Sequence, residues 1–164
     1  MELGCVHRTE GDQGGLEVEV LARMLKIVSL NSREAIEIAI LNRGGPDLSA
    51  DSKISTICSL TRGGWDLSVE ALYSRKRLRI FRDELLAMHR ELSIGQAASI
   101  WSAQGNVAIS IVLAERGSVA FRCVLSGPRI DKGLFAQGLI DQTYLPEIAR
   151  QVDELSNAPD CGGD

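Results

Sequence analysis

Short runs in which apolar and polar residues alternate occupy most of this chain. The segment 16–20 alternates leucine and valine with glutamate, and 36–40 places isoleucine at every second position. This period of two is typical of strands with one buried face and one solvated face. We expect nine strands, at residues 16–20, 25–30, 36–41, 53–60, 66–73, 98–103, 107–114, 119–125 and 134–140.

The period changes to that of a helix in two places. After Ser74, which we expect to cap a helix, apolar residues recur at spacings of three and four until shortly before Gly95. A second helix is expected after Thr143, its predicted cap, because a first helical turn tolerates Pro146. The two buried stripes comprise Leu78, Phe81, Leu85, Met88 and Leu92, and Leu145, Ile148, Val152 and Leu155.

The connections between the strands are short and rich in glycine. Gly63 and Gly64 separate two strand-like runs and predict a hairpin, and the later strands follow one another as an antiparallel meander. Residues 32–42 are ambiguous, because Ser32-Arg33-Glu34-Ala35 also resembles the start of a helix; we prefer a strand. The prediction is an α+β fold, with a meander-rich antiparallel sheet of about eight or nine strands packed on two helices in two layers.

The length of 164 residues suits one domain, which we place at residues 15–156 between a flexible leader, 1–14, and a flexible tail, 157–164. No apolar run is long enough to span a bilayer. The first 15 residues contain Glu2, Glu10 and Asp12 and lack a basic start followed by an apolar segment, so we expect no export signal and a cytoplasmic location.

The residue types that most often act in catalysis or bind metals form no recognisable catalytic or metal-binding motif. Cys5, Cys58, Cys123 and Cys161 include no C-x-x-C pair and no nearby histidine that would complete a zinc ligand set, which favours free thiols without a metal. No nucleophile motif accompanies the only two histidines, and no glycine pair has the context of a phosphate-binding loop. We therefore expect no catalytic residue, no cofactor and no enzymatic activity, although scattered carboxylates leave an acid/base site open.

The charge is unevenly distributed along the chain. Between Arg75 and Glu91 six basic residues accompany three acidic ones, which gives +3 there and −7 for everything else. The basic segment is short and poor in aromatic residues, so we interpret it as a solvated helix face, not as a nucleic-acid site. The acidic remainder favours a basic protein partner and argues against direct contact with nucleic acid.

Residues 53–155 resemble the WapI-type immunity proteins, which protect bacteria against wall-associated and Rhs-like polymorphic toxins. The resemblance comprises the hairpin, the helix beginning with the string at 78–85, the meander and the closing string Asp141-Gln142-Thr143-Tyr144-Leu145-Pro146. The first third of the chain is similar only in being short strands. The chain departs from the family in the meander, where the usual glycine-rich turn is reduced to Gln104-Gly105-Asn106.

The resemblance implies stoichiometric occlusion of a cognate toxin domain, often a nuclease with a basic groove. On that basis we expect partner contacts from Glu17, Glu19, Glu37, Asp51, Glu70 and Trp65, whereas Asp141, Gln142, Thr143 and Tyr144 are expected to maintain the fold. A small-ligand-binding or enzymatic α+β domain and a regulatory subunit of another complex remain as alternatives. The sequence leaves the toxin and the oligomeric state open.

Overall fold

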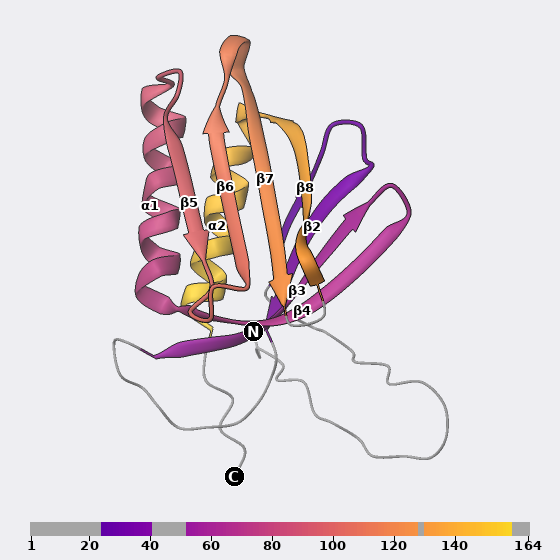
Figure 1. Cartoon of the computed structure of the whole chain (residues 1–164). Helices are drawn as coiled ribbons and strands as arrows, with labels where there is room; N and C mark the ends of the chain where they lie inside the picture. Colours follow the sequence, from indigo (N-terminus) through magenta and orange to yellow (C-terminus); the bar gives the residue numbers. More distant parts are fainter. Residues whose placement is uncertain (1–23, 41–51, 128–129, 159–164) are drawn as a thin grey trace, which may run out of the picture.

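The described part of the chain repeats one order of elements, four strands followed by a helix. The computed structural model describes residues 24–40, 52–127 and 130–158 (Figure 1). Two 3₁₀ turns, η1 (Glu115–Gly117) and η2 (Gln142–Tyr144), interrupt the second half. The main elements are β1 (Met24–Val28), β2 (Glu34–Ile40), β3 (Lys53–Arg62), β4 (Trp65–Ser74), α1 (Arg75–Glu91), β5 (Ala97–Trp101), β6 (Val107–Leu113), β7 (Ser118–Gly127), β8 (Ile130–Asp141) and α2 (Leu145–Ser156).

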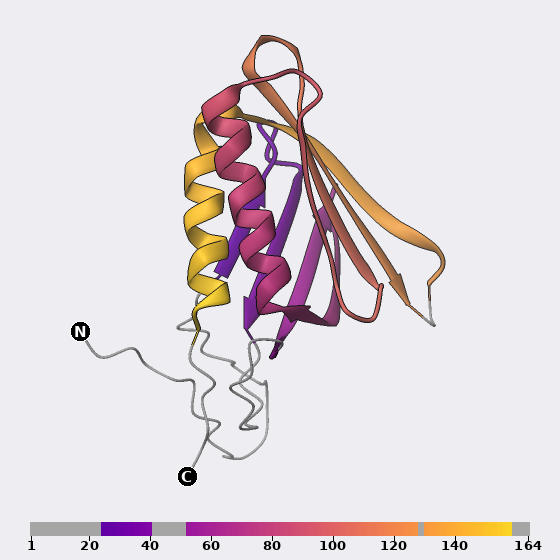
Figure 2. The same cartoon turned by 90° about the vertical axis from the view of Figure 1, so that its left-hand side faces the viewer.

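The eight strands divide into two antiparallel sheets. Sheet A holds β1 to β4 and sheet B holds β5 to β8, each in chain order. Figure 2 shows α1 and α2 side by side along one side of the molecule, with the two sheets spreading apart from each other. The predicted α+β class, the antiparallel meanders and the two helices are confirmed. The division into two sheets is new, because alternation within a strand does not say which strands pair.

Several sequence predictions can be compared with the observed bounds. Residues 34–40 form a strand, which resolves the ambiguity at 32–42 in favour of the preferred strand. The expected strand at 16–20 and the leader at 1–14 lie outside the described residues. Of the expected tail, Asn157 and Ala158 are described: the N–H of Asn157 bonds to Asp153 at the end of α2, and Ala158 is buried.

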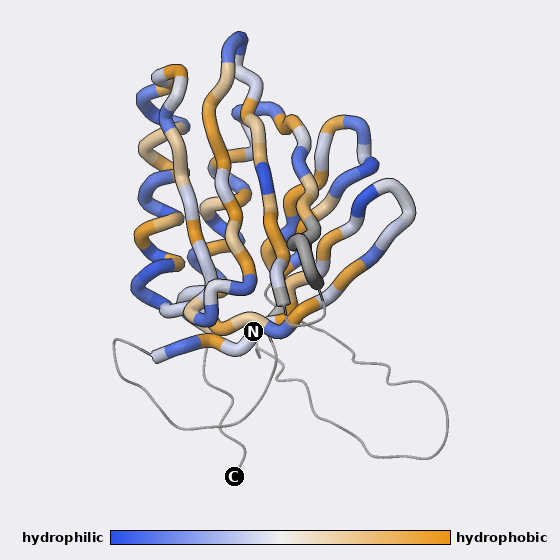
Figure 3. Tube along the Cα trace, in the orientation of Figure 1, coloured by the Kyte–Doolittle hydropathy of each residue, from blue (hydrophilic) through white to orange (hydrophobic). Residues whose placement is uncertain are grey.

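The inner faces of both sheets and the facing sides of the two helices share one apolar core. The buried positions alternate along the strands, as the hydropathy colouring in Figure 3 makes visible. Cys58 and Cys123 are buried free thiols within this core, and Tyr73 and Phe121 are among its largest side chains. All four predicted stripe residues of α2 are buried, whereas Leu92 of the α1 stripe is 46% exposed.

Two of the predicted helix caps are wrong. Ser74 stands at the cap position of α1, but its side chain makes no capping hydrogen bond, because β4 continues directly into the helix with Ser74 still extended and paired with Lys53. Ahead of α2, the Asp141 carboxylate caps turn η2 by accepting the backbone N–H of Thr143 at 2.8 Å. The residue at the cap position of α2 is Tyr144, which makes no side-chain capping hydrogen bond.

Arg75 ties the start of α1 to the end of α2. Its Nη1 atom donates to the carbonyl oxygens of Ser156 at 2.7 Å and Ala158 at 2.8 Å, and its Nε donates to the Ser52 hydroxyl at 2.8 Å. The last carbonyls of a helix lack helical donors, so a guanidinium there satisfies them and complements the negative end of the helix dipole. This basic residue of the predicted solvated face thus has a structural role.

Gly138 of β8 permits the close approach of the two sheets. The turn between β1 and β2 lies against β8, with the Leu30 N–H donating to the Leu139 carbonyl at 2.8 Å. A Cβ atom on Gly138 would lie 2.6 Å from the Ser29 Cβ and 2.8 Å from the ring of Phe121. Only a residue without a side chain fits between them.

We predict that Gly138→Ala destabilises the fold by about 1–3 kcal/mol, because the added methyl group forces Ser29 or Phe121 to move in a packed region. The free energy of unfolding, measured by urea denaturation, tests this expectation. The control is Gln137→Ala, whose exposed side chain on the neighbouring residue should change stability by less than about 0.5 kcal/mol. Equal stability of the two variants would contradict this account of the junction.

Candidate partner-binding surface

The outer face of sheet B is an exposed surface of unusual composition. Residues directly opposite one another in adjacent antiparallel strands point to the same side of the sheet. The strand register therefore places twelve side chains on this face, which we name the sheet B platform: Trp101, Ala108, Val124 and Phe135; Ser99, Ser110, Arg122 and Gln137; Ala97, Val112, Ala120 and Leu139.

The platform combines exposed apolar side chains with one positive charge. Leu139 is 49% exposed, Trp101 46% and Val112 37%. Arg122 is the only charged residue of the twelve, and the platform contains no lysine, aspartate or glutamate. Protein-binding surfaces are typically enriched in aromatic residues and arginine and depleted of lysine and carboxylates at their centre.

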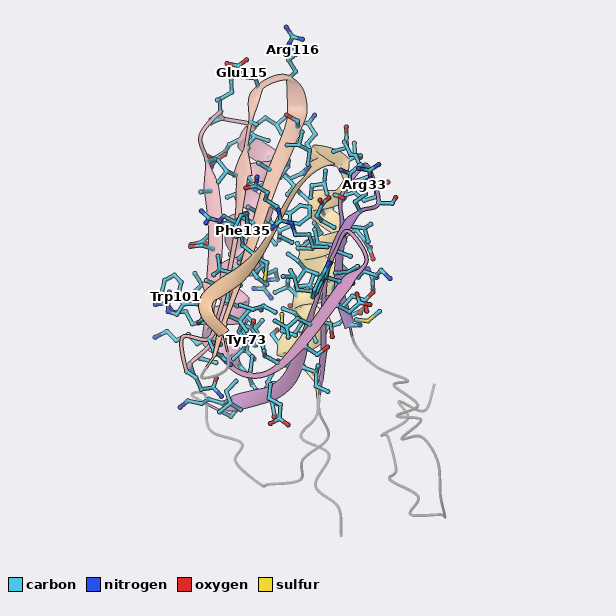
Figure 4. The ribbon with its side chains drawn as sticks, turned by 45° about the vertical axis from the view of Figure 1, so that its right-hand side comes forward. Arg33, Tyr73, Trp101, Glu115, Arg116 and Phe135 are labelled. Atoms are coloured by element: carbon cyan, nitrogen blue, oxygen red, sulfur yellow. The ribbon has the colours of Figure 1, made fainter. Side chains whose placement is uncertain are left out.

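Arginine side chains flank the two aromatic residues of the platform. The guanidinium of Arg77, from the first turn of α1, lies 4.2 Å from the centre of the Trp101 ring. Phe135 has the guanidinium of Arg62 at 4.8 Å and that of Arg122 at 5.3 Å. Figure 4 shows Trp101 projecting at the margin of sheet B and labels Phe135 on the same sheet. A cation over an aromatic ring at an exposed site favours that arrangement by about 0.5–1 kcal/mol.

The dimensions of the platform suit the centre of an interface. Three strand spacings separate Trp101 from Phe135, which corresponds to about 14 Å, and the three rows extend about 14 Å along the strands. The resulting area of about 200 Å² is roughly a quarter of what one partner buries in an ordinary stable complex. The platform can therefore supply the central contacts, with the surrounding residues completing the interface.

Of the carboxylates expected to bind a partner, the structure describes Glu37 and Glu70, which lie on the same face of sheet A. Glu37 lies on the outer face of sheet A and forms an ion pair with Lys26 at 2.6 Å, and Glu70 is exposed on β4 of the same sheet. Trp65 is 82% exposed beside the β3–β4 turn. Glu17, Glu19 and Asp51 lie outside the described residues.

The net acidity of the chain also lies mostly outside the described ranges. These ranges contain 14 lysines and arginines and 13 aspartates and glutamates, a formal charge of +1, against −4 for the whole chain. The remaining residues carry the balance of −5. Electrostatic steering by an acidic fold therefore has no support from residues 24–40, 52–127 and 130–158.

The closing string of the sequence lies at the junction of β8 and α2, where it makes contacts within the chain. Asp141 accepts the Thr143 N–H, and the Gln142 side chain lies against Gly117, where an added Cβ would approach it to 3.1 Å. Tyr144 is exposed. The contacts of Asp141 and Gln142 are those of residues that position α2 on the end of sheet B.

Two buried groups with reactive atoms, Cys123 and Tyr73, have raised pKa values. A hydrogen bond with Cys58 and burial raise the pKa of the Cys123 thiol, which keeps it protonated, whereas a nucleophilic thiol needs a lowered pKa. Burial likewise raises the pKa of Tyr73, whose hydroxyl has no hydrogen-bond partner among the described residues. His89 is exposed on α1. Within the same ranges, no three histidine, cysteine or carboxylate side chains are grouped to hold a metal ion.

The sequence analysis did not single out the platform residues. A signal was present: at the outward positions of the four strands from 97 to 139, alanine, serine and apolar residues recur without a single carboxylate. The pattern becomes visible only when the strand register puts Trp101, Arg122 and Phe135 on one face.

None of the helices in the described ranges is both long and apolar enough to cross a membrane.

Comparison with known proteins gives distant structural similarity alone. No protein-family model and no curated protein matches the chain. The solved structure of MRP1/MRP2 from Trypanosoma bruciei is similar with a TM-score of 0.46 and 11% identity, covering 84% of this chain and 88% of that chain. The plant transcriptional regulator PBF-2 has a TM-score of 0.45 and 8% identity, covering 81% and 79%. Neither similarity is close enough to carry an inference about function.

We predict that the contribution of Asp141 to stability depends on pH. The hydrogen bonds from the backbone and hydroxyl of Thr143 lower the pKa of Asp141 below that of an ordinary aspartate. Since the folded-state pKa is the lower one, the stabilisation is complete above about pH 4 and is lost as the pH falls through the folded value. The melting temperature of Asp141→Ala should fall below that of the unmodified chain at pH 7, and the gap should narrow in acid.

A second substitution distinguishes the contribution of the capping hydrogen bond to stability from the contribution of the carboxylate charge. Asp141→Asn keeps an acceptor oxygen for the Thr143 N–H and has no titratable group, so its stability at pH 7 should lie between the other two. A gap between Asp141→Ala and the unmodified chain that stays constant from pH 7 to strong acid would refute the assigned role.

Proposed function

We propose that this chain is a protein-binding domain that presents the sheet B platform to a protein partner and acts by covering part of that partner in a stoichiometric complex. The observation that carries the proposal is the coincidence of arginine-flanked aromatic side chains with the absence of lysine and carboxylates from the twelve platform positions; Asp141 follows at the end of β8. Tryptophan and arginine are the residues that most often dominate the binding energy of protein interfaces.

The chemistry of the platform indicates what the partner surface should contain. Arg122 on the platform and Arg62 and Arg77 at its margins favour carboxylates at the edge of the partner surface, and the apolar rows favour an apolar centre. On α1, Glu84 accepts the backbone N–H of Ser99 at 3.1 Å and so occupies an outward backbone group of β5. The partner is thus expected to contact the face of the sheet.

The resemblance to WapI-type immunity proteins supplies the biological setting of the proposal. In that setting the partner is the toxic domain of a polymorphic toxin encoded next to this chain, and binding blocks its catalytic cleft or substrate path. The closing string 141–146, which contributes most to the resemblance, supports the junction of sheet B with α2 and so helps to hold the platform in place.

Co-expression with the C-terminal domain of the neighbouring toxin gene tests the proposal. The full chain should rescue growth, and Leu139→Asp should bind the domain at least tenfold more weakly by calorimetry, because it places a charge in the apolar row. Leu92→Asp is a matched control: Leu92 is 46% exposed, close to the 49% of Leu139, but it lies at the end of α1. Rescue and affinity unaffected by Leu139→Asp, or lost equally with Leu92→Asp, would remove the platform from the interface.

Single-stranded nucleic acid is a second candidate ligand, favoured by the same arginine and aromatic pairs. Nucleic-acid bases stack on exposed aromatic rings and on guanidinium planes, and this stacking depends little on the base sequence. Fluorescence anisotropy with a labelled 20-nucleotide oligo-dT or oligo-U separates the two candidates. Binding at physiological salt that is lost in Trp101→Ala would favour nucleic acid over the protein partner.

A further inference from the structure

The edge of β4 has a covered half and an open half. At the covered half, the backbone of Leu72 makes two hydrogen bonds: its N–H donates to the Gln104 side chain at 2.9 Å, and its carbonyl accepts the Ala103 N–H at 2.7 Å. The Glu70 carbonyl accepts a hydrogen bond from the Asn106 side-chain amide at 2.8 Å. Backbone groups of alternate residues in a strand point to the same side. Those of Ser68 and Asp66 therefore face the same edge, where no described residue hydrogen-bonds to them.

The other edge strands have partners for at least some of their outward backbone groups. On β1 the Lys26 N–H donates to Gln151, and on β5 the Ser99 N–H donates to Glu84. On β8 the Leu139 carbonyl accepts from Leu30, and the Phe135 carbonyl accepts from Arg62 at 3.1 Å. Natural proteins cover strand edges because an open edge pairs with other chains. β4 likewise has partners at Leu72 and Glu70, while its start at Ser68 and Asp66 has no backbone partner among the described residues.

The side chains of the open half, Trp65–Glu70, differ between its two sides. Trp65, Leu67 and Val69 alternate on the side of the sheet that faces the core, and Trp65 is 82% exposed while the other two are only partly buried. Asp66, Ser68 and Glu70 occupy the outer side, and all three are exposed. A strand added here would meet apolar groups on one side and carboxylates on the other.

We propose that the open half of β4 binds an extended segment of a partner protein in which basic and apolar residues alternate, by strand addition to sheet A. Backbone hydrogen bonds to Ser68 and Asp66 would hold the segment, and its basic side chains would lie beside the outer carboxylates. This segment requires no contact with the sheet B platform, so the proposal stands apart from the proposed function.

Charge disfavours one symmetric register of pairing with a second copy of the chain. Symmetric pairing of two β4 strands about Ser68 puts Asp66 of one copy directly opposite Glu70 of the other. Like charges at directly opposed positions destabilise a strand pair. A basic segment meets no such repulsion.

Binding of labelled peptides to the full chain tests the proposal. The probes are two capped eight-residue peptides, one alternating lysine with valine and one alternating glutamate with valine, followed by fluorescence anisotropy. The lysine peptide should bind at least tenfold more tightly. Equal affinities, or no binding of the lysine peptide at millimolar concentration, would overturn the proposal.

Four variants distinguish pairing along the β4 edge from peptide binding elsewhere on the surface. Ser68→Pro removes the outward N–H and should lower the affinity for the lysine peptide at least tenfold. Ser68→Ala keeps that N–H, and its affinity for the lysine peptide should lie within about twofold of that of the unmodified chain. Asp66→Lys leaves the backbone intact and should shift the preference towards the glutamate peptide, which keeps the test informative if the proline variant fails to fold. Leu139→Asp should bind the peptide normally.

Two results would contradict the edge assignment directly. One is unchanged peptide affinity in a folded Ser68→Pro variant. The other is a dimer of the unmodified chain in sedimentation velocity that Ser68→Pro abolishes, because a second copy would then occupy the edge.

Discussion

The burial of both inner sheet faces in one shared core is the constraint on which the rest of this structure depends. Each sheet has four strands with an apolar face too large to leave in water, and the same two helices and the opposite sheet cover both. Cys58 of sheet A and Cys123 of sheet B are buried free thiols in this shared core. Because every inner face is used in this way, the outer faces and the edges remain for binding.

The two halves of the chain bury their inner sheet faces in the same way, but their outer sheet faces differ in charge. The order of four strands and a helix occurs twice, and α1 packs along α2. The outer face of sheet A includes Lys26, Glu37, Asp66 and Glu70, whereas the twelve residues of the sheet B platform carry one charge, that of Arg122. Selection on the inner faces alone would not produce this difference, since the outward positions contribute little to the core. The difference is what directs the functional proposal to sheet B.

The sequence predicted local structure well wherever one periodicity dominated. Gly63 and Gly64, with φ of 54° and 88°, form the expected hairpin turn, and both helices occur where the apolar stripes placed them. The caps were harder, because Ser74 has the residue type of a cap but a strand runs into the helix there. The candidate surface could not be found from the sequence, because Trp101 and Phe135 are 34 positions apart and meet only through the pairing of four strands. The excess of acidic residues lies outside the described ranges, so their expected role in partner binding stays a prediction.

The chain holds two tryptophans, and the structure places Trp101 on the sheet B platform and Trp65 at the open start of β4. Titration of the ¹⁵N-labelled chain with the toxin domain, followed through the two indole N–H resonances, therefore reports which surface the partner covers. The account predicts a large shift or broadening of the Trp101 resonance. A saturating partner that left Trp101 unchanged while it perturbed Trp65 would contradict the assignment of partner binding to sheet B.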